Sequence, residues 1–181
     1  MTNRITAKQR RLIKELDELY YYFHLDYADL VHELKGESLT ARLEVTKDKV
    51  IRAQIIVWYT LVDEYLNIKL CHYFFGAKAD FIRLWKTKKF RLFNYHILEE
   101  LSLMKKLAFV RALIKMPKQI VSDIERLNAL RNGIAHAFYP QNLKRNTPIY
   151  KGKDIFTIEG LRLLRDDSER VLKYLGKIAR A

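Results

Sequence analysis

Residues 128–140 of this sequence contain three polar side chains whose types and spacing could act on a phosphodiester: Arg131, Asn132 and His136. Histidine has an unperturbed pKa of about 6.5, so His136 could accept a proton and give it back near neutral pH. Arg131 is always charged and can hold a phosphate through two parallel hydrogen bonds. Asn132 could orient either group. These residue types therefore indicate acid–base chemistry on a phosphate-containing substrate.

A helix over this stretch would separate the polar groups from an apolar face. At about 100° per residue, His136 falls opposite the apolar stripe, and Asn132 lies one turn before it on the same side. Arg131 lies about 140° from His136, so a straight helix does not bring the two together. The length of arginine, or a second copy of the helix across a symmetry axis, could do so. The apolar stripe consists of Ile120, Ile124, Leu127, Leu130, Ile134 and Phe138.

Gly133 lies between these polar residues, inside the predicted helix. A glycine there costs up to about 1 kcal/mol relative to alanine, and some other interaction should offset that cost. One interpretation is the close approach of another backbone or a ligand beside His136. The other is tight helix packing inside the monomer.

The run at residues 131–136 (RNGIAH) resembles the R-x4-6-H signature of HEPN domains, an all-helical family rich in ribonucleases. Many members carry a polar residue directly after the arginine, as Asn132 does here. The run also lies late in the penultimate long helix of a chain of HEPN-like size. Residues 91–96 (RLFNYH) have the same bare spacing, but Leu92 takes the polar position, and we interpret that match as coincidence.

The resemblance implies an endoribonuclease that works without a metal ion or other cofactor, typically as a homodimer in which the two motifs meet in a cleft. His136 would take the proton from an RNA 2′-OH or donate one to the leaving 5′-oxygen. Arg131 would stabilise charge on the phosphorane-like transition state, and Asn132 would assist. Attack by the 2′-OH predicts a 2′,3′-cyclic phosphate product and no cleavage of DNA.

The resemblance also implies a place in a toxin–antitoxin or phage-defence system. The expected partners are RNA, a second copy of the chain and an antitoxin protein, of the nucleotidyltransferase type or another. HEPN toxins paired with nucleotidyltransferases often read R-x4-6-H-x-Y, where the tyrosine is a modification target. Phe138 takes that slot here and the tyrosine is displaced to Tyr139, which argues against regulation by tyrosine nucleotidylation in this chain.

The charge of the chain favours a polyanionic partner. Its 181 residues include 34 Lys and Arg against 21 Asp and Glu, a net charge of +13. Four basic stretches, residues 2–14, 78–91, 104–118 and 141–153, contain one acidic residue between them. If they converge on one side they form a phosphate-binding surface, whereas taken singly each can be a solvated helix face. The residues predicted to contact RNA are Lys105, Lys106, Tyr139, Lys144 and Arg145.

Cysteine content and hydropathy bound the environment of the protein. Cys71 is the only cysteine, which excludes an intrachain disulfide and any site built from several cysteines. We therefore expect a reducing, cytoplasmic location. No stretch approaches the roughly 18 to 20 apolar residues of a membrane span, so no membrane partner is expected.

The pattern of apolar residues and helix stop signals predicts an all-α, HEPN-like bundle in a single domain over residues 1–181. Six glycines and three prolines favour long helices. A capping box at Thr6 and Gln9 would begin the first helix and Gly36 would end it. The very apolar stretch at residues 55–62 predicts a helix at the centre of the bundle.

The prediction comprises five main helices and a possible small β-hairpin before the last helix, which Thr157 would cap. The second helix would begin between Thr40 and Asp48 and end at Phe75, before Gly76. A short helical piece would follow around residues 81–85. The remaining predicted elements are helices over 93–115 and from 117 or 122 to 138, strands at 149–150 and 155–156, and a helix ending near 179.

Three alternatives stay open at this point. The chain could be a catalytically silent HEPN module that binds RNA or a protein partner, or a helical dimerisation domain whose charge serves solubility. Within the site, Asp63 or Glu64 on the apolar helix could hold Arg131. The same acids could instead form an internal salt bridge or leave the core at the helix face.

Overall fold

The computed structural model describes residues 36–76, 80–135 and 148–180. The predicted first helix, with its capping box at Thr6 and Gln9, lies outside these residues. The structure divides into two units, Met1–Lys49 and Val50–Ala181, and helix α2 (Gly36–Phe75) runs through the boundary. The start of α2 is the described part of the first unit. One domain over 1–181 stays a prediction.

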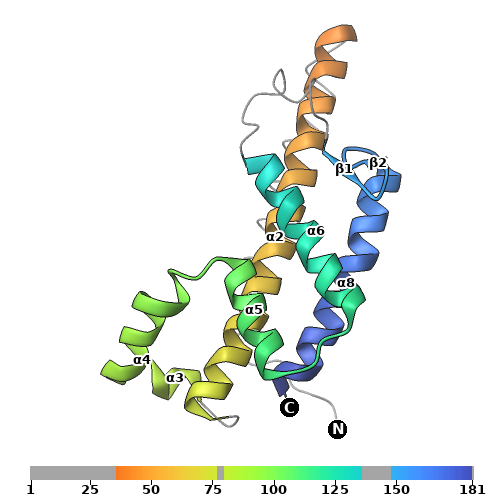
Figure 1. Cartoon of the computed structure of the whole chain (residues 1–181). Helices are drawn as coiled ribbons and strands as arrows, with labels where there is room; N and C mark the ends of the chain where they lie inside the picture. The colour runs from red at the N-terminus through yellow and green to blue at the C-terminus, as the bar shows by residue number, and fades with distance from the viewer. Residues whose placement is uncertain (1–35, 77–79, 136–147, 181) are drawn as a thin grey trace, which may run out of the picture. The chain divides into compact units, whose positions relative to one another are not determined.

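The described residues are mainly helical, with one two-stranded hairpin before the last helix, and this confirms the predicted all-α class. Figure 1 shows the elements in chain order. After α2 come α3 (Phe81–Leu84), α4 (Lys88–Phe93), the π-helix η1 (Asn94–Leu98), α5 (Leu103–Leu113), α6 (Lys118–Ala135), β1 (Ile149–Tyr150), β2 (Lys153–Asp154) and α8 (Ile158–Arg180).

The predicted helix boundaries at Gly76 and Thr157 are confirmed, and the predicted start of α2 is wrong. Gly76 follows the end of α2 with φ of 98°, and its amide donates to the His72 carbonyl at 2.9 Å. Thr157 precedes α8, and its hydroxyl accepts the Gly160 amide at 3.1 Å. However, α2 begins at Gly36 itself, before the predicted interval that starts at Thr40. Glycine is also tolerated at helix N-caps, so it marks a boundary without saying on which side the helix lies.

The helix predicted over 93–115 is instead split into the end of α4, η1 and α5. The apolar pattern continues across the break, but the Ser102 hydroxyl accepts the Lys105 amide at 3.4 Å and starts α5 as a new helix. The second strand of the hairpin is also displaced from the predicted 155–156. Lys151 and Gly152, with φ of 49° and 79°, join Tyr150 directly to Lys153 in a two-residue turn.

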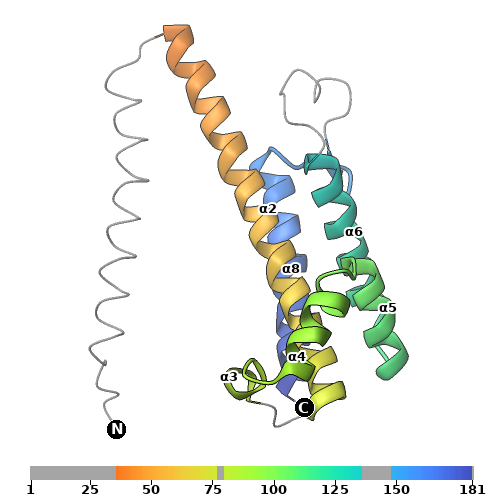
Figure 2. The same cartoon turned by 90° about the vertical axis from the view of Figure 1, so that its left-hand side faces the viewer.

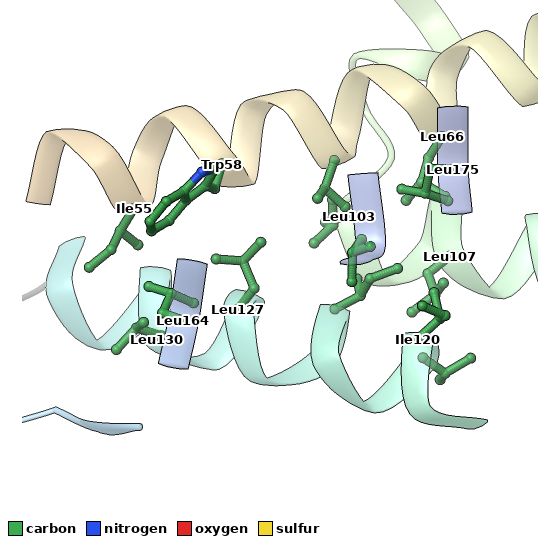
Figure 3. Packing of buried hydrophobic residues seen from close by; sticks show 14 of the residues in the cluster. Ile55, Trp58, Leu66, Leu103, Leu107, Ile120, Leu127, Leu130, Leu164 and Leu175 are labelled. Atoms are coloured by element: carbon green, nitrogen blue, oxygen red, sulfur yellow. The ribbon is translucent and has the colours of Figure 1, made fainter. Parts of the chain in front are cut away.

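The core of the second unit lies between the described helices α2, α5, α6 and α8, which contribute mostly leucine and isoleucine (Figure 3). In Figures 1 and 2, α6 runs beside both α8 and α5. The stripe predicted on α6 is buried at each of its described positions, which are Ile120, Ile124, Leu127, Leu130 and Ile134. The last predicted member, Phe138, lies outside the described residues. Helix α6 is therefore oriented as its periodicity requires.

The middle of α2 is not enclosed by the core, as the predicted position at the centre of the bundle would require. Ile55 and Val62 are fully buried, but Ile56, Val57 and Leu61 are 53%, 49% and 42% exposed. The apolar stretch therefore packs one face into the core and leaves another accessible. Hydrophobic content on all sides of a helix indicates burial, but it does not identify what buries each side.

The buried carboxylate of Asp123 on α6 joins this helix to α8. It accepts the Gln119 side-chain amide at 2.8 Å, the Arg170 guanidinium at 2.8 Å, and the Arg126 guanidinium. Buried carboxylates are stable only when their oxygens are satisfied in this way. The side chain of Asp123 therefore fixes the register between α6 and α8.

Asp167 on α8 repeats this arrangement toward the hairpin. It accepts the Tyr150 hydroxyl at 2.8 Å and pairs with Lys151 and Arg170. Burial raises the pKa of Asp167, but hydrogen bonds from Lys151 and Tyr150 and the nearby positive charges outweigh it, so the net shift lowers the pKa. Burial and the bond to Asp167 raise the pKa of the Tyr150 hydroxyl. The hairpin is thus attached to α8 through an ionised carboxylate.

Two glycines should respond in opposite ways to substitution by alanine. A β-carbon at Gly160 would collide with the backbone carbonyl oxygen of Asp154, whereas one at Gly133 would meet no described atom within 4 Å. We expect Gly160→Ala to lower the free energy of unfolding by about 2 kcal/mol. Gly133→Ala should raise it by up to about 1 kcal/mol. Urea unfolding of both variants measures this, and equal shifts would contradict the described packing.

Asp167 should make the fold sensitive to acid. Its pKa is lowered on folding, so its stabilising contribution is present above the unfolded value of about 3.9 and is lost as pH falls through the folded pKa. Asp167→Asn should therefore destabilise the protein at neutral pH and reduce the loss of stability between about pH 4 and 2. The control is Asp166→Asn, a half-exposed neighbour. Acid unfolding curves of equal slope for wild type and Asp167→Asn would refute this role.

Candidate functional site

Arg131 lies near the C-terminal end of α6, beside the buried stripe formed by its neighbours Leu130 and Ile134. Its side chain is half-buried, with the guanidinium carbon 5.1 Å from the centre of the Tyr59 ring. One guanidinium nitrogen donates to the Asn132 side-chain oxygen at 3.2 Å. The sequence predicts that Asn132 can orient Arg131, and the structure places the two side chains in contact. It adds an aromatic ring beneath the Arg131 cation.

Four half-buried polar residues form a stripe along α2, next to its buried apolar stripe: Arg52, Tyr59, Asp63 and Asn67. We call this set the polar stripe. Its members are spaced by seven, four and four residues, which places them on one helix face. Sequence analysis missed Arg52 and Tyr59, although this spacing is a signal that could have identified them. The structure shows that the polar stripe faces α5 and α6, since three of its members contact side chains or carbonyls there.

Arg52 brings a second guanidinium to the end of α6. It donates to the Ile134 carbonyl at 3.2 Å, and its guanidinium carbon lies 5.3 Å from the centre of the Phe156 ring. The last carbonyls of a helix lack intrahelical partners and carry partial negative charge. The Arg52 guanidinium therefore satisfies one of these carbonyls at the end of α6.

Asp63 pairs with Lys106 on α5 and not with Arg131. The Lys106 ammonium lies 2.7 and 2.9 Å from the two carboxylate oxygens. The internal salt bridge is therefore the correct interpretation for Asp63, while Glu64 is exposed. Within the described residues, no carboxylate lies within ion-pair distance of Arg131. Its guanidinium is positioned by a ring and an amide, which leave its charge uncompensated.

The two lysines predicted to contact RNA separate in the structure. Lys105 is exposed, but Lys106 is only 4% exposed and its ammonium is held by Asp63. Lys106 therefore has a structural partner and presents no charge on the surface, because α5 begins at Leu103 and turns this position inward. The other predicted site residues, His136, Tyr139, Lys144 and Arg145, lie outside the described residues.

Gly133 is exposed and has open space where a side chain would be. Of its two interpretations, tight packing within the monomer finds no support among the described residues. The close approach of a ligand or a second chain stays a prediction. Gly133 lies two residues after Arg131 and so on nearly the opposite side of α6, where it leaves the helix surface flat and accessible beside Asn132.

Burial raises the pKa of the Tyr59 hydroxyl; the charge of Arg131 opposes this and that of Asp63 adds to it. The net shift is upward, and the neutral phenol suits the position of the ring against a cation. Across the part of the chain that the structure describes, no group of three or more His, Cys, Asp and Glu side chains could hold a metal ion. No described helix is long and apolar enough to cross a bilayer.

Comparisons with protein-family models, with curated proteins and with solved structures found no match. The site is therefore characterised by its own contacts. They bring together Arg131, Asn132, Tyr59 and Arg52 at one end of α6, and they separate Lys106 from this group.

Adjacent lysines on α5 should differ sharply in their effect on stability. Lys106→Ala removes the ammonium and leaves the partly buried Asp63 carboxylate without its cation, which should cost about 2 kcal/mol of unfolding free energy. Lys105→Ala changes an exposed side chain and should stay within about 0.5 kcal/mol of wild type. Chemical denaturation of the two variants tests this. A Lys106→Ala protein as stable as Lys105→Ala would show that the ion pair does not form.

Proposed function

We propose that this chain is a HEPN-type endoribonuclease that cleaves RNA without a metal ion. The observation that carries the proposal is the setting of Arg131. Its guanidinium is held by the Tyr59 ring and the Asn132 amide, and no described carboxylate neutralises it. A pre-oriented guanidinium of this kind can bind a phosphate through two hydrogen bonds and stabilise charge that develops during its cleavage.

His136 supplies the acid–base step in this proposal. It takes the proton of a ribose 2′-OH as the 2′-oxygen attacks phosphorus, and the imidazolium so formed gives a proton to the 5′-oxygen as its bond to phosphorus breaks. Arg131 binds the non-bridging oxygens, and Asn132 orients Arg131 through the hydrogen bond between them. The products are a 2′,3′-cyclic phosphate and a free 5′-OH. DNA has no 2′-OH and stays intact.

The proposal includes a second copy of the chain and, in a toxin–antitoxin or phage-defence system, an antitoxin protein. On a straight helix Arg131 and His136 point in different directions and cannot meet. In a homodimer, Arg131 of one copy can lie near His136 of the other. The exposed Asn132 and Gly133 leave that side of α6 accessible to another chain or to RNA.

The test is incubation of purified full-length protein with labelled RNA in excess EDTA. Wild type should release fragments that end in 2′,3′-cyclic phosphate and should leave DNA of the same sequence intact. His136→Ala should reduce the rate by about 10²- to 10⁴-fold, as expected for loss of a general acid–base. Arg131→Ala should reduce it by about 10²- to 10³-fold through lost charge stabilisation.

The matched control is His96→Ala, which alters the histidine of the other R-x4-H spacing and is exposed on η1. It should cleave RNA like wild type. Equal cleavage by wild type and His136→Ala contradicts the proposal, and so does loss of cleavage in His96→Ala alone. RNA that is bound but never cleaved would identify the chain as a silent binding module.

A further inference from the structure

A second surface, far along the chain from Arg131, combines exposed rings with unpaired cations. It lies on the turn between α3 and α4, on α4 and on η1, in the part of the chain that follows α2 (Figure 1). We call it the basic–aromatic surface and define it by its exposed residues Trp85, Lys86, Lys88, Lys89, Arg91, Leu92 and Tyr95.

Four cations of this surface form no ion pair among the described residues. Residues 81–98 contain five Lys and Arg and no Asp or Glu. Glu99 and Glu100 follow directly in the sequence, and Glu99 accepts the Asn94 side-chain amide at 2.6 Å. The preceding acid, Asp80, caps α3 and pairs with Arg83 at 3.3 Å. Among the described residues, no carboxylate pairs with the four other cations. By contrast, Lys151 and Lys153 pair with acids of α8.

Two exposed rings lie among these cations in fixed positions. Trp85 and Tyr95 are 43% and 52% exposed, with ring centres 6.2 Å apart. Trp85 packs edge-to-face on the buried Phe90 at 5.2 Å, and Phe90 packs on Phe75 of α2 at 5.3 Å. This aromatic cluster holds the Trp85 ring in place while leaving nearly half of it accessible. Nucleobases stack on rings presented in this way, and adjacent cations hold the phosphates.

We propose that the basic–aromatic surface binds single-stranded RNA, with bases stacked on Trp85 and Tyr95 and phosphates contacted by Lys86, Lys88 and Arg91. This goes beyond the proposed cleavage at Arg131, because it assigns a separate site that holds the strand. The binding site depends on the proposed function in one respect: that function is the reason for choosing RNA over another polyanion.

The arrangement of the side chains favours RNA over an anionic bilayer. A helix that lies in a membrane surface needs one continuous apolar face. Here α3 and α4 have only four and six residues, and cations alternate with apolar side chains, as at Arg91 and Leu92. Ile82 is 77% exposed but neighbours Arg83, whose side chain is 87% exposed. A flexible single-stranded RNA can follow a surface on which cations and apolar side chains alternate. The flat apolar interior of a bilayer cannot.

The binding test uses the full chain and a fluorescein-labelled 2′-O-methyl RNA of about 12 nucleotides, which cannot be cleaved by 2′-OH attack. Lys88→Glu with Arg91→Glu should weaken binding at least about tenfold in fluorescence anisotropy at roughly 0.1 M salt. The matched control is Lys173→Glu with Lys177→Glu, two exposed cations of α8 outside the four basic stretches that give the same change in net charge. It should weaken binding less than about threefold.

The stacking test uses the two tryptophans of the chain, Trp58 and Trp85. In Trp58→Phe the fluorescence comes from Trp85 alone, and binding of the RNA should quench it. A second variant, Trp85→Ala, keeps Trp58 and should weaken RNA binding about tenfold. It tests stacking even if Trp58→Phe fails to fold.

Equal weakening by both charge variants overturns the proposal, as does full RNA affinity in Trp85→Ala. A blue shift of Trp85 with phosphatidylserine vesicles, without quenching by RNA, also overturns it and assigns the surface to membranes. Because the RNA cannot be cleaved, failure here leaves the cleavage assay untouched. Absence of cleavage in that assay likewise leaves this binding result unaffected.

Discussion

The ion pair between Asp63 and Lys106 determines the electrostatic environment of Arg131. Asp63 and Tyr59 lie one turn apart on the polar stripe of α2, so the Asp63 carboxylate is on the same helix face as the ring over which the Arg131 guanidinium lies. Lys106 satisfies both oxygens of that carboxylate from α5. Arg131 is left with a ring and an amide, which orient it without cancelling its charge. A charge held in this way is what the proposed phosphate chemistry requires.

Two further constraints position the helices that carry this site. The buried stripe of α6 fixes its rotation, which places Arg131 at the boundary of the core, while Asn132 is exposed. The buried carboxylates Asp123 and Asp167 then link α6 to α8 and α8 to the hairpin. Apolar burial is non-directional, so these hydrogen-bonded acids supply register that the hydrophobic contacts alone do not specify.

Features that depend on a few neighbouring residues could be predicted from the sequence. The end of α2 at Gly76, the cap at Thr157 and the buried stripe of α6 are of this kind. The burial of Lys106 and the contact of Tyr59 with Arg131 could not be predicted, because each depends on which helix lies opposite. The helix cap at Ser102 is also a local signal. The prediction missed it because the apolar pattern continues across that position. The charge excess of the chain was evident, but its location became clear only when the paired cations could be separated from the unpaired ones.

The proposed function requires that the guanidinium of Arg131 bind a phosphate. The most direct measurement is the arginine side-chain ¹⁵Nε resonance of Arg131, assigned by its absence in Arg131→Lys and followed while uncleavable 2′-O-methyl dinucleotide is added. We expect a saturable shift of this resonance, together with the neighbouring amide signals of Asn132. A resonance of Arg131 that stays unchanged while other arginines of the protein shift would contradict it.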